Sequence, residues 1–193
     1  MERGQPIDRY YIDKFLEENR ADIKGICLEI RDNRYTGRYG ANIEKADVLD
    51  IDKSNPDAAI YGDLRSLGAV KNNSYDCIIL TQTLQYIDDL KAAVSECYRI
   101  LKPGGVILAT APTMSRIDPH AEQVKEFWRF TEGGLRYIFE QSFSPDKVRT
   151  GSYGNIATGL GFWIGQAAEE LTKKELNRND SDFPVLTSIK ATK

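Results

Sequence analysis

The chain has 193 residues, a length that suits one ordinary α/β domain and is tight for two. Hydrophobic residues make up 41% and charged residues 28%, which is a globular composition rather than a disordered or fibrous one. The formal net charge of −3 offers no basic excess of the kind that favours nucleic-acid partners. No apolar run is long enough to cross a bilayer, and the N-terminus lacks the apolar core of a signal peptide.

The three cysteines, Cys27, Cys77 and Cys97, lie far apart in the sequence. An odd number without paired spacing argues against a disulfide framework and against a zinc site, so we expect no metal. Cys27 and Cys77 stand inside apolar runs, which predicts that they are buried as small core residues. These features predict a reduced, cytoplasmic protein that does not associate with membranes.

Short apolar runs alternate with helical patterns, which predicts a parallel α/β sheet. The clearest strand is the continuous apolar run 75–80, and the clearest helix is the amphipathic segment 88–101. Segments 31–42 and 52–57 are predicted as a polar loop and a turn, 102–105 as a helix stop and tight turn, and 112–126 as a loop or partial helix. The remaining predicted elements are helices over 8–19, 131–141 (capped by Thr131) and 156–171, and strands over 25–30, 43–51, 58–61, 106–111, 147–153 and 185–192.

The strongest sequence signal covers 75–112. The strand YDCIIL at 75–80 is followed by the turn TQTLQYI at 81–87 and by a helix that ends in RILKPGG at 99–105. This order and spacing resembles the class I S-adenosylmethionine-dependent methyltransferases, in a divergent type 11-like subgroup. Glu29 at the end of the first strand and the Gly62-Asp63-Leu64 motif extend the resemblance to 25–112, and the segment beginning Trp128-Arg129 adds a less specific match.

The resemblance implies a Rossmann-like α/β fold, with a mostly parallel central sheet flanked by helices and an antiparallel C-terminal strand. It also implies S-adenosylmethionine as the cofactor. We expect a single domain over 1–193: an N-terminal helical segment (1–24), a cofactor-binding core (25–112), and an acceptor-side and sheet-closing part (113–193). The chain is also compatible with being one domain of a larger multidomain protein.

The resemblance assigns roles to acidic residues at strand ends. The ribose hydroxyls of the cofactor call for a carboxylate near the end of the second strand, and Asp50 is preferred there over Asp52. Asp63 is expected to accept a hydrogen bond from the adenine amine, and Leu64 to pack on the ring. Glu29 is placed for the ammonium of the methionine end, directly or through the loop that follows.

The loop at 31–40 departs from the glycine-rich pattern of the family. Only Gly37 and Gly40 remain, and Gly37 is the glycine predicted to contact the cofactor. Glycine at such a loop lets the backbone approach a ligand closely, so bulky residues there favour a degenerate site. On the methyl side, the residues that follow the fourth strand are expected to line the site, namely Thr81, Gln82 and Leu84.

The acceptor side is predicted from residues after the fourth and fifth strands. Tyr86, Trp128 and Arg129 are candidates for a wall of the substrate pocket. His120, the single histidine, has a pKa range that suits a general base for a hydroxyl acceptor, and Asp118 is a second candidate.

Two hypotheses from different classes follow. The first is methyl transfer to a small-molecule or sugar hydroxyl. A saccharide is preferred, because the subgroup resembled occurs beside glycosyltransferases in cell-surface sugar pathways, and a small aromatic or amine metabolite is the runner-up. The second is a degenerate, non-catalytic module that acts as an interaction or scaffold domain. A nicotinamide-dependent oxidoreductase is disfavoured, because no G-x-G-x-x-G follows the first strand.

Overall fold

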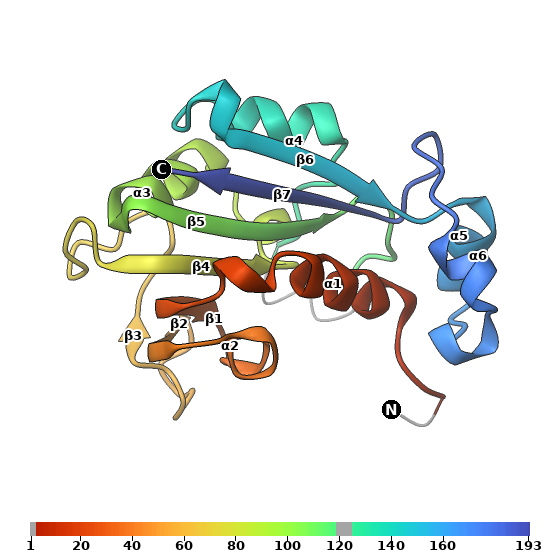
Figure 1. Ribbon diagram of the computed structural model, residues 1–193, viewed down its shortest axis with the longest axis horizontal. Coiled ribbons are helices and arrows are strands. Elements are labelled where there is room, and N and C mark those ends of the chain that lie inside the picture. The colour runs from red at the N-terminus through yellow and green to blue at the C-terminus, as the bar shows by residue number, and fades with distance from the viewer. Residues whose placement is uncertain (1–2, 119–124) are drawn as a thin grey trace.

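The computed structural model describes residues 3–118 and 125–193, which form a central sheet with helices on both faces (Figure 1). The strands are β1 (Gly25–Ile30), β2 (Ile43–Asp50), β3 (Ile60–Tyr61), β4 (Tyr75–Thr81), β5 (Leu101–Pro112), β6 (Val148–Tyr153) and β7 (Leu186–Thr192). The helices are α1 (Ile7–Glu18), α2 (Arg34–Tyr39), α3 (Leu90–Ile100), α4 (Glu132–Phe139), α5 (Ile156–Trp163) and α6 (Lys173–Asn177). Short 3₁₀ turns are η1 (Arg20–Asp22), η2 (Leu84–Tyr86), η3 (Pro145–Lys147) and η4 (Ala168–Glu170).

The strands form one sheet in the order β3-β2-β1-β4-β5-β7-β6. β1 to β5 pair in parallel, and β7 lies antiparallel between β5 and β6. This arrangement confirms the predicted fold class. Because β6 therefore runs in the same direction as β5, the chain leaves both strands at the same edge of the sheet. The helices α5 and α6, which follow β6, lie at this edge (Figure 1).

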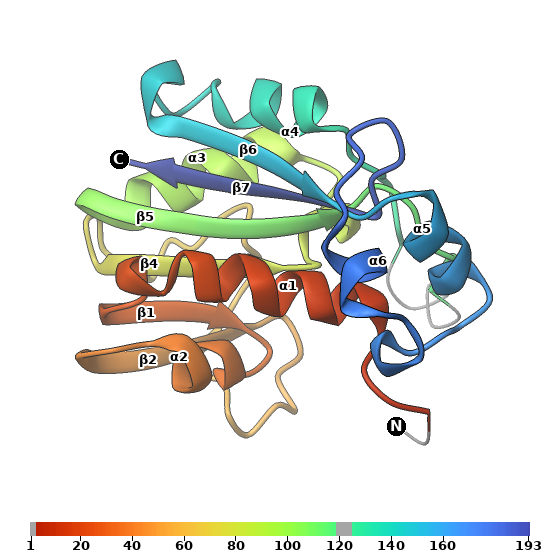
Figure 2. The same cartoon turned by 45° about the vertical axis from the view of Figure 1, so that its right-hand side comes forward.

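Alternating side chains of the central strands fill two separate cores. Leu28, Ile78 and Ile107 face a core closed by α3 and α4, whereas Cys77 and Leu108 face a core closed by α1 and α2. Figure 2 shows α1 and α2 together on the near face of the sheet, with α3 and α4 behind it. The period of two in the strands thus builds the two buried interfaces that the apolar runs predicted. The three cysteines are buried and free, as their positions in apolar runs indicated.

The segment 31–42 contains a short helix where the sequence predicted only a loop. Tyr35 and Tyr39 are one helical turn apart, both are buried, and their rings stack with centroids 6.4 Å apart. This i, i+4 aromatic pair attaches α2 to the sheet and is the signal that the prediction missed.

Two other predicted boundaries differ. The expected turn at 102–105 belongs to β5, because the backbone N–H of Gly104 donates to Lys193 O and the N–H of Lys193 donates to Gly105 O. The sheet therefore includes this segment, and the positive φ of 78° at Gly104 accommodates its irregular path. The helix expected over 156–171 ends at Trp163, just before Gly165 takes a φ of 74°. Within the described residues, no helix combines the length and apolar character needed to span a bilayer.

Candidate cofactor and acceptor site

The predicted cofactor residues gather where the parallel strands end. Glu29 is the penultimate residue of β1, Asp50 is the last residue of β2, and Thr81 is the last residue of β4. In open α/β sheets, ligands bind at the carboxyl ends of the strands, so these residues share the expected edge. His120, the predicted general base, lies outside the described residues.

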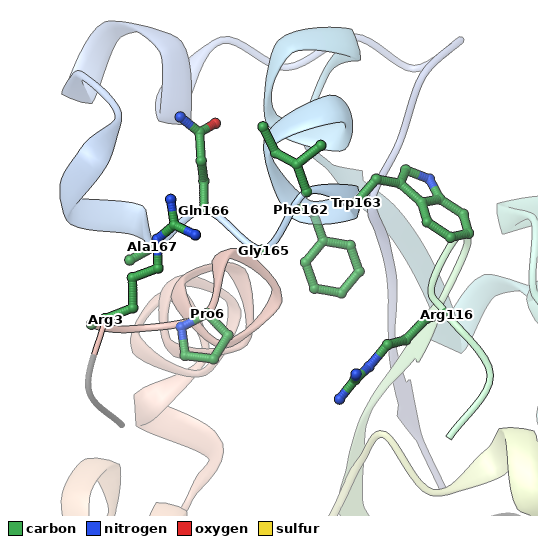
Figure 3. A pocket seen from close by; sticks show the side chains of 10 residues that line it. Arg3, Pro6, Arg116, Phe162, Trp163, Gly165, Gln166 and Ala167 are labelled. Atoms are coloured by element: carbon green, nitrogen blue, oxygen red, sulfur yellow. The ribbon is translucent and has the colours of Figure 1, made fainter. Parts of the chain in front are cut away.

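A cavity of about 590 Å³ opens at the same end of the molecule (Figure 3). It lies between the arm before α1, the end of α5 with the turn that follows, and the segment after β5. The arm is fixed by a bridge between Pro6 and Ala167 and by the N–H of Ala168, which donates to Gln5 O at 2.8 Å. The lining residues are Arg3, Gly4, Pro6, Arg116, Phe162, Trp163, Ile164, Gly165, Gln166 and Ala167.

The lining of this cavity differs from the predicted acceptor wall. Tyr86, Trp128 and Arg129 are not among its lining residues. The sequence feature that could have indicated this cavity is the apolar segment after β6, which was predicted only as a helix. In the fold, small residues such as Gly159 and Gly161 face inward, and Leu160 and Trp163 are exposed.

Glu29 is buried and holds the start of α2. Its carboxylate accepts hydrogen bonds from Tyr35 N at 3.1 Å, Thr36 N at 2.9 Å and Thr36 Oγ1 at 2.9 Å. Burial raises the pKa of Glu29 above its usual range, against the lowering effect of these hydrogen bonds. Both carboxylate oxygens of Glu29 face the start of α2, so the role that the structure shows for Glu29 is to position this helix.

Gly37 lies on the exposed side of α2, and a Cβ added there would meet no atom within 4 Å. It therefore forms no close cradle in this structure, and its contact with the cofactor stays a prediction. Gly40 is different, since an added Cβ would meet Thr36 O at 2.5 Å and the Ile43 side chain at 2.7 Å. Gly40 is required by the packing of α2 against the start of β2.

Asp50 and Asp52 have different environments. Asp50 is buried, and its carboxylate accepts from Asp52 N at 2.9 Å and from Asn55 Nδ2 at 2.7 Å. Asp52 is exposed and accepts from Ser54 N and Ser54 Oγ, which lower its pKa. Since an ionised carboxylate has about four acceptor sites, Asp50 keeps capacity for further donors. Asp52 caps the turn, which supports the preference for Asp50.

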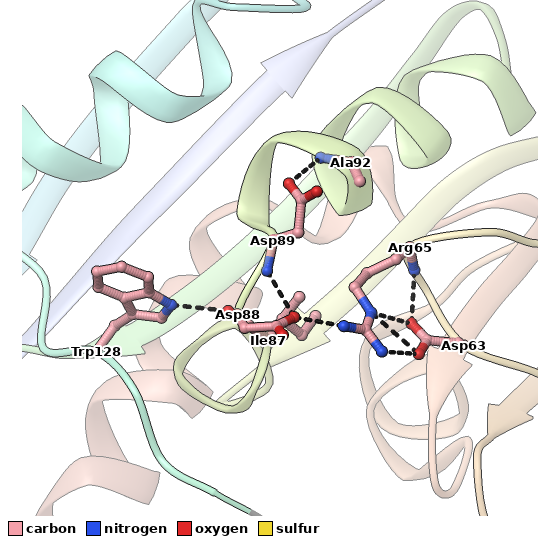
Figure 4. Close-up of polar contacts among 7 residues, drawn as sticks. All are labelled: Asp63, Arg65, Ile87, Asp88, Asp89, Ala92 and Trp128. Atoms are coloured by element: carbon pink, nitrogen blue, oxygen red, sulfur yellow. Dashed lines mark hydrogen bonds and ion pairs between the residues drawn. The ribbon is translucent and has the colours of Figure 1, made fainter.

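Asp63 is held by an arginine (Figure 4). The side chain of Arg65 forms ion pairs with Asp63 and Asp88, and the N–H of Arg65 also donates to Asp63 at 2.9 Å. The hydrogen bonds from the Arg65 side chain are the largest cause that lowers the pKa of Asp63. An adenine amine would share this carboxylate with Arg65. Leu64 is 6% exposed and packs in the core on the α3 side of the sheet.

The predicted methyl side contains a residue with positive φ near buried polar atoms. Gln82 has a φ of 48°, and its N–H donates to Thr110 O at 3.0 Å, while Leu84 is buried in the core. Non-glycine residues with positive φ are uncommon and gather at functional sites. Among the described residues, three buried side-chain atoms near the ends of β4 and β5 lack a hydrogen-bond partner: Gln85 Oε1, Thr110 Oγ1 and Thr113 Oγ1.

The unpartnered hydroxyl of Thr110 makes a stability prediction. We expect Thr110→Val to raise the free energy of unfolding by about 1 kcal/mol, because it removes a buried polar atom that pairs with nothing. Thr187 on β7 is the matched control, since it is equally buried but its Oγ1 donates to Ala111 O at 3.1 Å. Thr187→Val should lower the free energy by about 1 kcal/mol. Urea unfolding of both variants measures the difference, and equal shifts of the same sign would contradict the assignment.

The three predicted acceptor residues hold neighbouring segments together. Tyr86 donates from its hydroxyl to Asp118 Oδ2 at 3.0 Å, and burial with this contact raises the pKa of Tyr86 to about 12. Trp128 Nε1 donates to Ile87 O at 2.7 Å. Arg129 pairs with Glu126 at 3.1 Å and donates to Arg116 O at 3.2 Å. They thereby fix the segment after β5 against η2, and their contact with substrate stays a prediction.

The residues at this edge suit the hydrogen-bonding character of S-adenosylmethionine. The ribose hydroxyls, the adenine amine and the methionine ammonium are all donors. The edge supplies acceptors: the carboxylate of Asp50, which has unused capacity, the carboxylate of Asp63, and the unpartnered Gln85 Oε1. The acceptors Asp50 and Asp63 thus fit the donors on the ribose and adenine of the cofactor.

Comparison with known proteins finds similarity to methyltransferases. Residues 31–109 match the sequence model of a family described as a methyltransferase domain. A probable polyketide synthase of Dictyostelium discoideum is 31% identical over 75 residues, which are 38% of this chain and 3% of that protein. A probable S-adenosylmethionine-dependent methyltransferase of Mycolicibacterium smegmatis is 31% identical over 81 residues, which are 42% of this chain and 31% of that protein. The chain thus spans less than a third of the length of either relative.

The fold is also that of solved methyltransferases. The crystal structure of an S-adenosylmethionine-dependent methyltransferase from Archaeoglobus fulgidus matches with a TM-score of 0.62 at 15% identity, over 96% of this chain and 94% of that one. The predicted class I methyltransferase fold is confirmed. Residues 31–109 of this chain are thus similar to a methyltransferase domain, and the chain has the fold of solved S-adenosylmethionine-dependent methyltransferases.

Proposed function

We propose that this chain transfers the methyl group of S-adenosylmethionine to a hydroxyl of a small molecule, with a saccharide as the first class to test and a small aromatic metabolite as the second. The observation that carries the proposal is the buried Asp50 at the end of β2, whose carboxylate keeps acceptor capacity. A cavity of ligand size opens at the same end of the sheet, after β5. The proposal treats 1–193 as one domain, in which 25–112 binds the cofactor and 113–193 forms the acceptor side.

The cofactor supplies, when bound, a sulfonium methyl group that is transferred by in-line displacement. The chain has to position the reactants and exclude water, because the leaving group is already good. Asp50 binds the ribose hydroxyls, and Glu29 fixes α2 at the methionine end. The Asp63 carboxylate accepts from the adenine amine as well as from Arg65. Leu84, buried on the methyl side, contributes a dry wall.

A hydroxyl acceptor loses a proton as its oxygen bonds to the methyl carbon and the carbon–sulfur bond breaks. Asp118, which accepts a hydrogen bond from Tyr86, is the carboxylate of the described acceptor side that is assigned this proton. Its place after β5 puts it on the segment that also bears Arg116. His120 remains a second proposed base on the same segment of the sequence.

Calorimetric titration with S-adenosylmethionine and S-adenosylhomocysteine tests the cofactor step. We expect both to bind with micromolar dissociation constants, since they share the adenosine and amino-acid groups that the edge recognises. A folded protein, verified by a cooperative thermal transition, that binds neither ligand would contradict the proposal.

The second candidate is a non-catalytic module of the same fold. It is favoured by one observation, the absence of a glycine cradle at Gly37 on α2. The same titration separates the two, because a degenerate module would fold normally and leave both ligands unbound.

A further inference from the structure

Among the described residues, the charged side chains that line the cavity are those of two arginines, Arg3 and Arg116. Two carboxylates lie beside the arm that bears Arg3: Glu170 pairs with Arg3 at 3.0 Å, and Glu169 accepts a hydrogen bond from Gln5 N at 2.9 Å. The positive charge that is left for a ligand is therefore that of Arg116, and a guanidinium favours an anionic ligand.

The two arginines differ in what they already bind. Arg3 forms a paired contact with Glu170, with Nε at 3.0 Å from Oε2 and Nη2 at 3.3 Å from Oε1. The guanidinium of Arg116 has no hydrogen-bond or ion-pair partner among the described residues. Figure 3 shows it extending from the segment after β5 to a position below the ring of Phe162. Arg116 is thus the available cation, and its planar fork matches a carboxylate or phosphate.

The rest of the wall suits a flat or apolar body attached to that anion. Phe162, Trp163 and Ile164 line the cavity beside Arg116. Trp163 is 55% exposed and Ile164 is 71% exposed, so neither is used to fill the core. Pockets for small molecules combine such apolar walls with one or two fixed polar groups.

Arg116 is also tied to the proposed reaction site. Its carbonyl accepts from Arg129 at 3.2 Å, and Asp118, two residues further on, accepts from Tyr86. Two residues of extended chain span at most about 7 Å, so the backbone positions that bear Arg116 and Asp118 are close to each other.

We propose that the methyl acceptor is an anionic small molecule whose carboxylate or phosphate binds Arg116 while its body packs against Phe162 and Trp163. This inference rests on the proposed function, since it names the acceptor class of the same site. The two possible sources of that chemistry are an acidic sugar and an aromatic acid, and the test separates them.

The test is a ligand-detected NMR titration with four probes, carried out with and without S-adenosylhomocysteine. The acidic probes are glucuronate and 4-hydroxybenzoate, and their neutral counterparts are methyl glucoside and methyl 4-hydroxybenzoate. We expect at least one acidic probe to bind more tightly than its neutral counterpart, and Arg116→Gln to weaken that binding about tenfold. Added salt should weaken it as well. The control is Arg149→Gln, on β6, whose guanidinium caps Asp146 O outside the cavity and which should leave binding unchanged.

Each outcome has one meaning. Equal binding of acidic and neutral probes, no binding of any acidic probe, or an unaffected Arg116→Gln variant would overturn the inference. If S-adenosylhomocysteine binds while the acidic probes do not, the inference fails and the proposed cofactor site stands. If an acidic probe binds through Arg116 while S-adenosylhomocysteine does not, the proposed function fails and the anion site stands.

Discussion

Asp50→Ala is expected to weaken S-adenosylmethionine binding at least tenfold, whereas Asp52→Ala should change it less than threefold. A hydrogen bond to a charged group contributes about 1.5–3 kcal/mol, and loss of one such bond corresponds to at least about a tenfold change in affinity. Asp50 stands buried at the end of β2 with unused acceptor capacity. Asp52 is exposed, and its carboxylate is engaged by Ser54. Calorimetric titration of the two variants provides a comparison between carboxylates only two positions apart.

The Asp50 variant also disturbs its own turn, because Asn55 Nδ2 bridges Asp50 Oδ2 and Arg31 O at 2.7 Å each. Asn55→Ala removes this bridge and keeps the carboxylate, so it measures the contribution of the turn alone. We expect Asn55→Ala to retain most of the affinity. If Asn55→Ala and Asp50→Ala lose affinity equally, the carboxylate does not contact the cofactor and its role is to hold the turn.

The sheet and its order of elements could be predicted because they depend on local signals. Buried parallel strands are continuous apolar runs, and the sequence predicted 25–30 and 75–80 within one residue of β1 and β4. Thr131 caps α4 as expected, accepting from Gly134 N at 3.1 Å. The motif at 99–105 pointed to the family.

The cavity between the N-terminal arm and the end of α5 could not be predicted, because it depends on contacts between segments far apart in the sequence. Gln5 meets Ala168 and Arg3 meets Glu170, each across more than 160 positions. No local pattern encodes such pairs. The exposed apolar residues of α5 were visible in the sequence, but an apolar helix ordinarily indicates burial, and only the fold shows that its glycines face inward.

The contacts of Asp63 were equally hidden. Its motif suggested an open acceptor for the adenine amine, and the structure pairs it with Arg65 two residues away. Arg65 also reaches Asp88, which precedes α3. The sequence contained all three charges, but their pairing requires the return of the chain through β4.

Glu29→Ala should lower the free energy of unfolding by about 3 kcal/mol, since it leaves the backbone N–H groups of Tyr35 and Thr36 and one hydroxyl without their buried acceptor. Glu29→Gln keeps one acceptor oxygen and should lose less. Chemical unfolding at pH 7 ranks the three proteins. If Glu29→Ala is as stable as the native chain, Glu29 does not hold α2.

The difference in the free energy of unfolding between the native chain and Glu29→Gln should depend on pH with a definite sign. Burial raises the pKa of Glu29 in the folded state above its reference value of 4.5, so the folded chain binds its proton more tightly than the unfolded chain does. Where the folded state holds more protons, stability falls as pH rises. The contribution of Glu29 is therefore largest below pH 4.5, decreases as pH rises toward the folded pKa, and is constant above it. Carboxylates with lowered pKa values, such as Glu96, act in the opposite direction in both proteins and cancel in the difference. The free energy of the native chain minus that of Glu29→Gln should thus decrease from pH 4 to pH 7, whereas a flat or rising difference would show that the three hydrogen bonds outweigh burial and hold Glu29 as a stable anion beside α2.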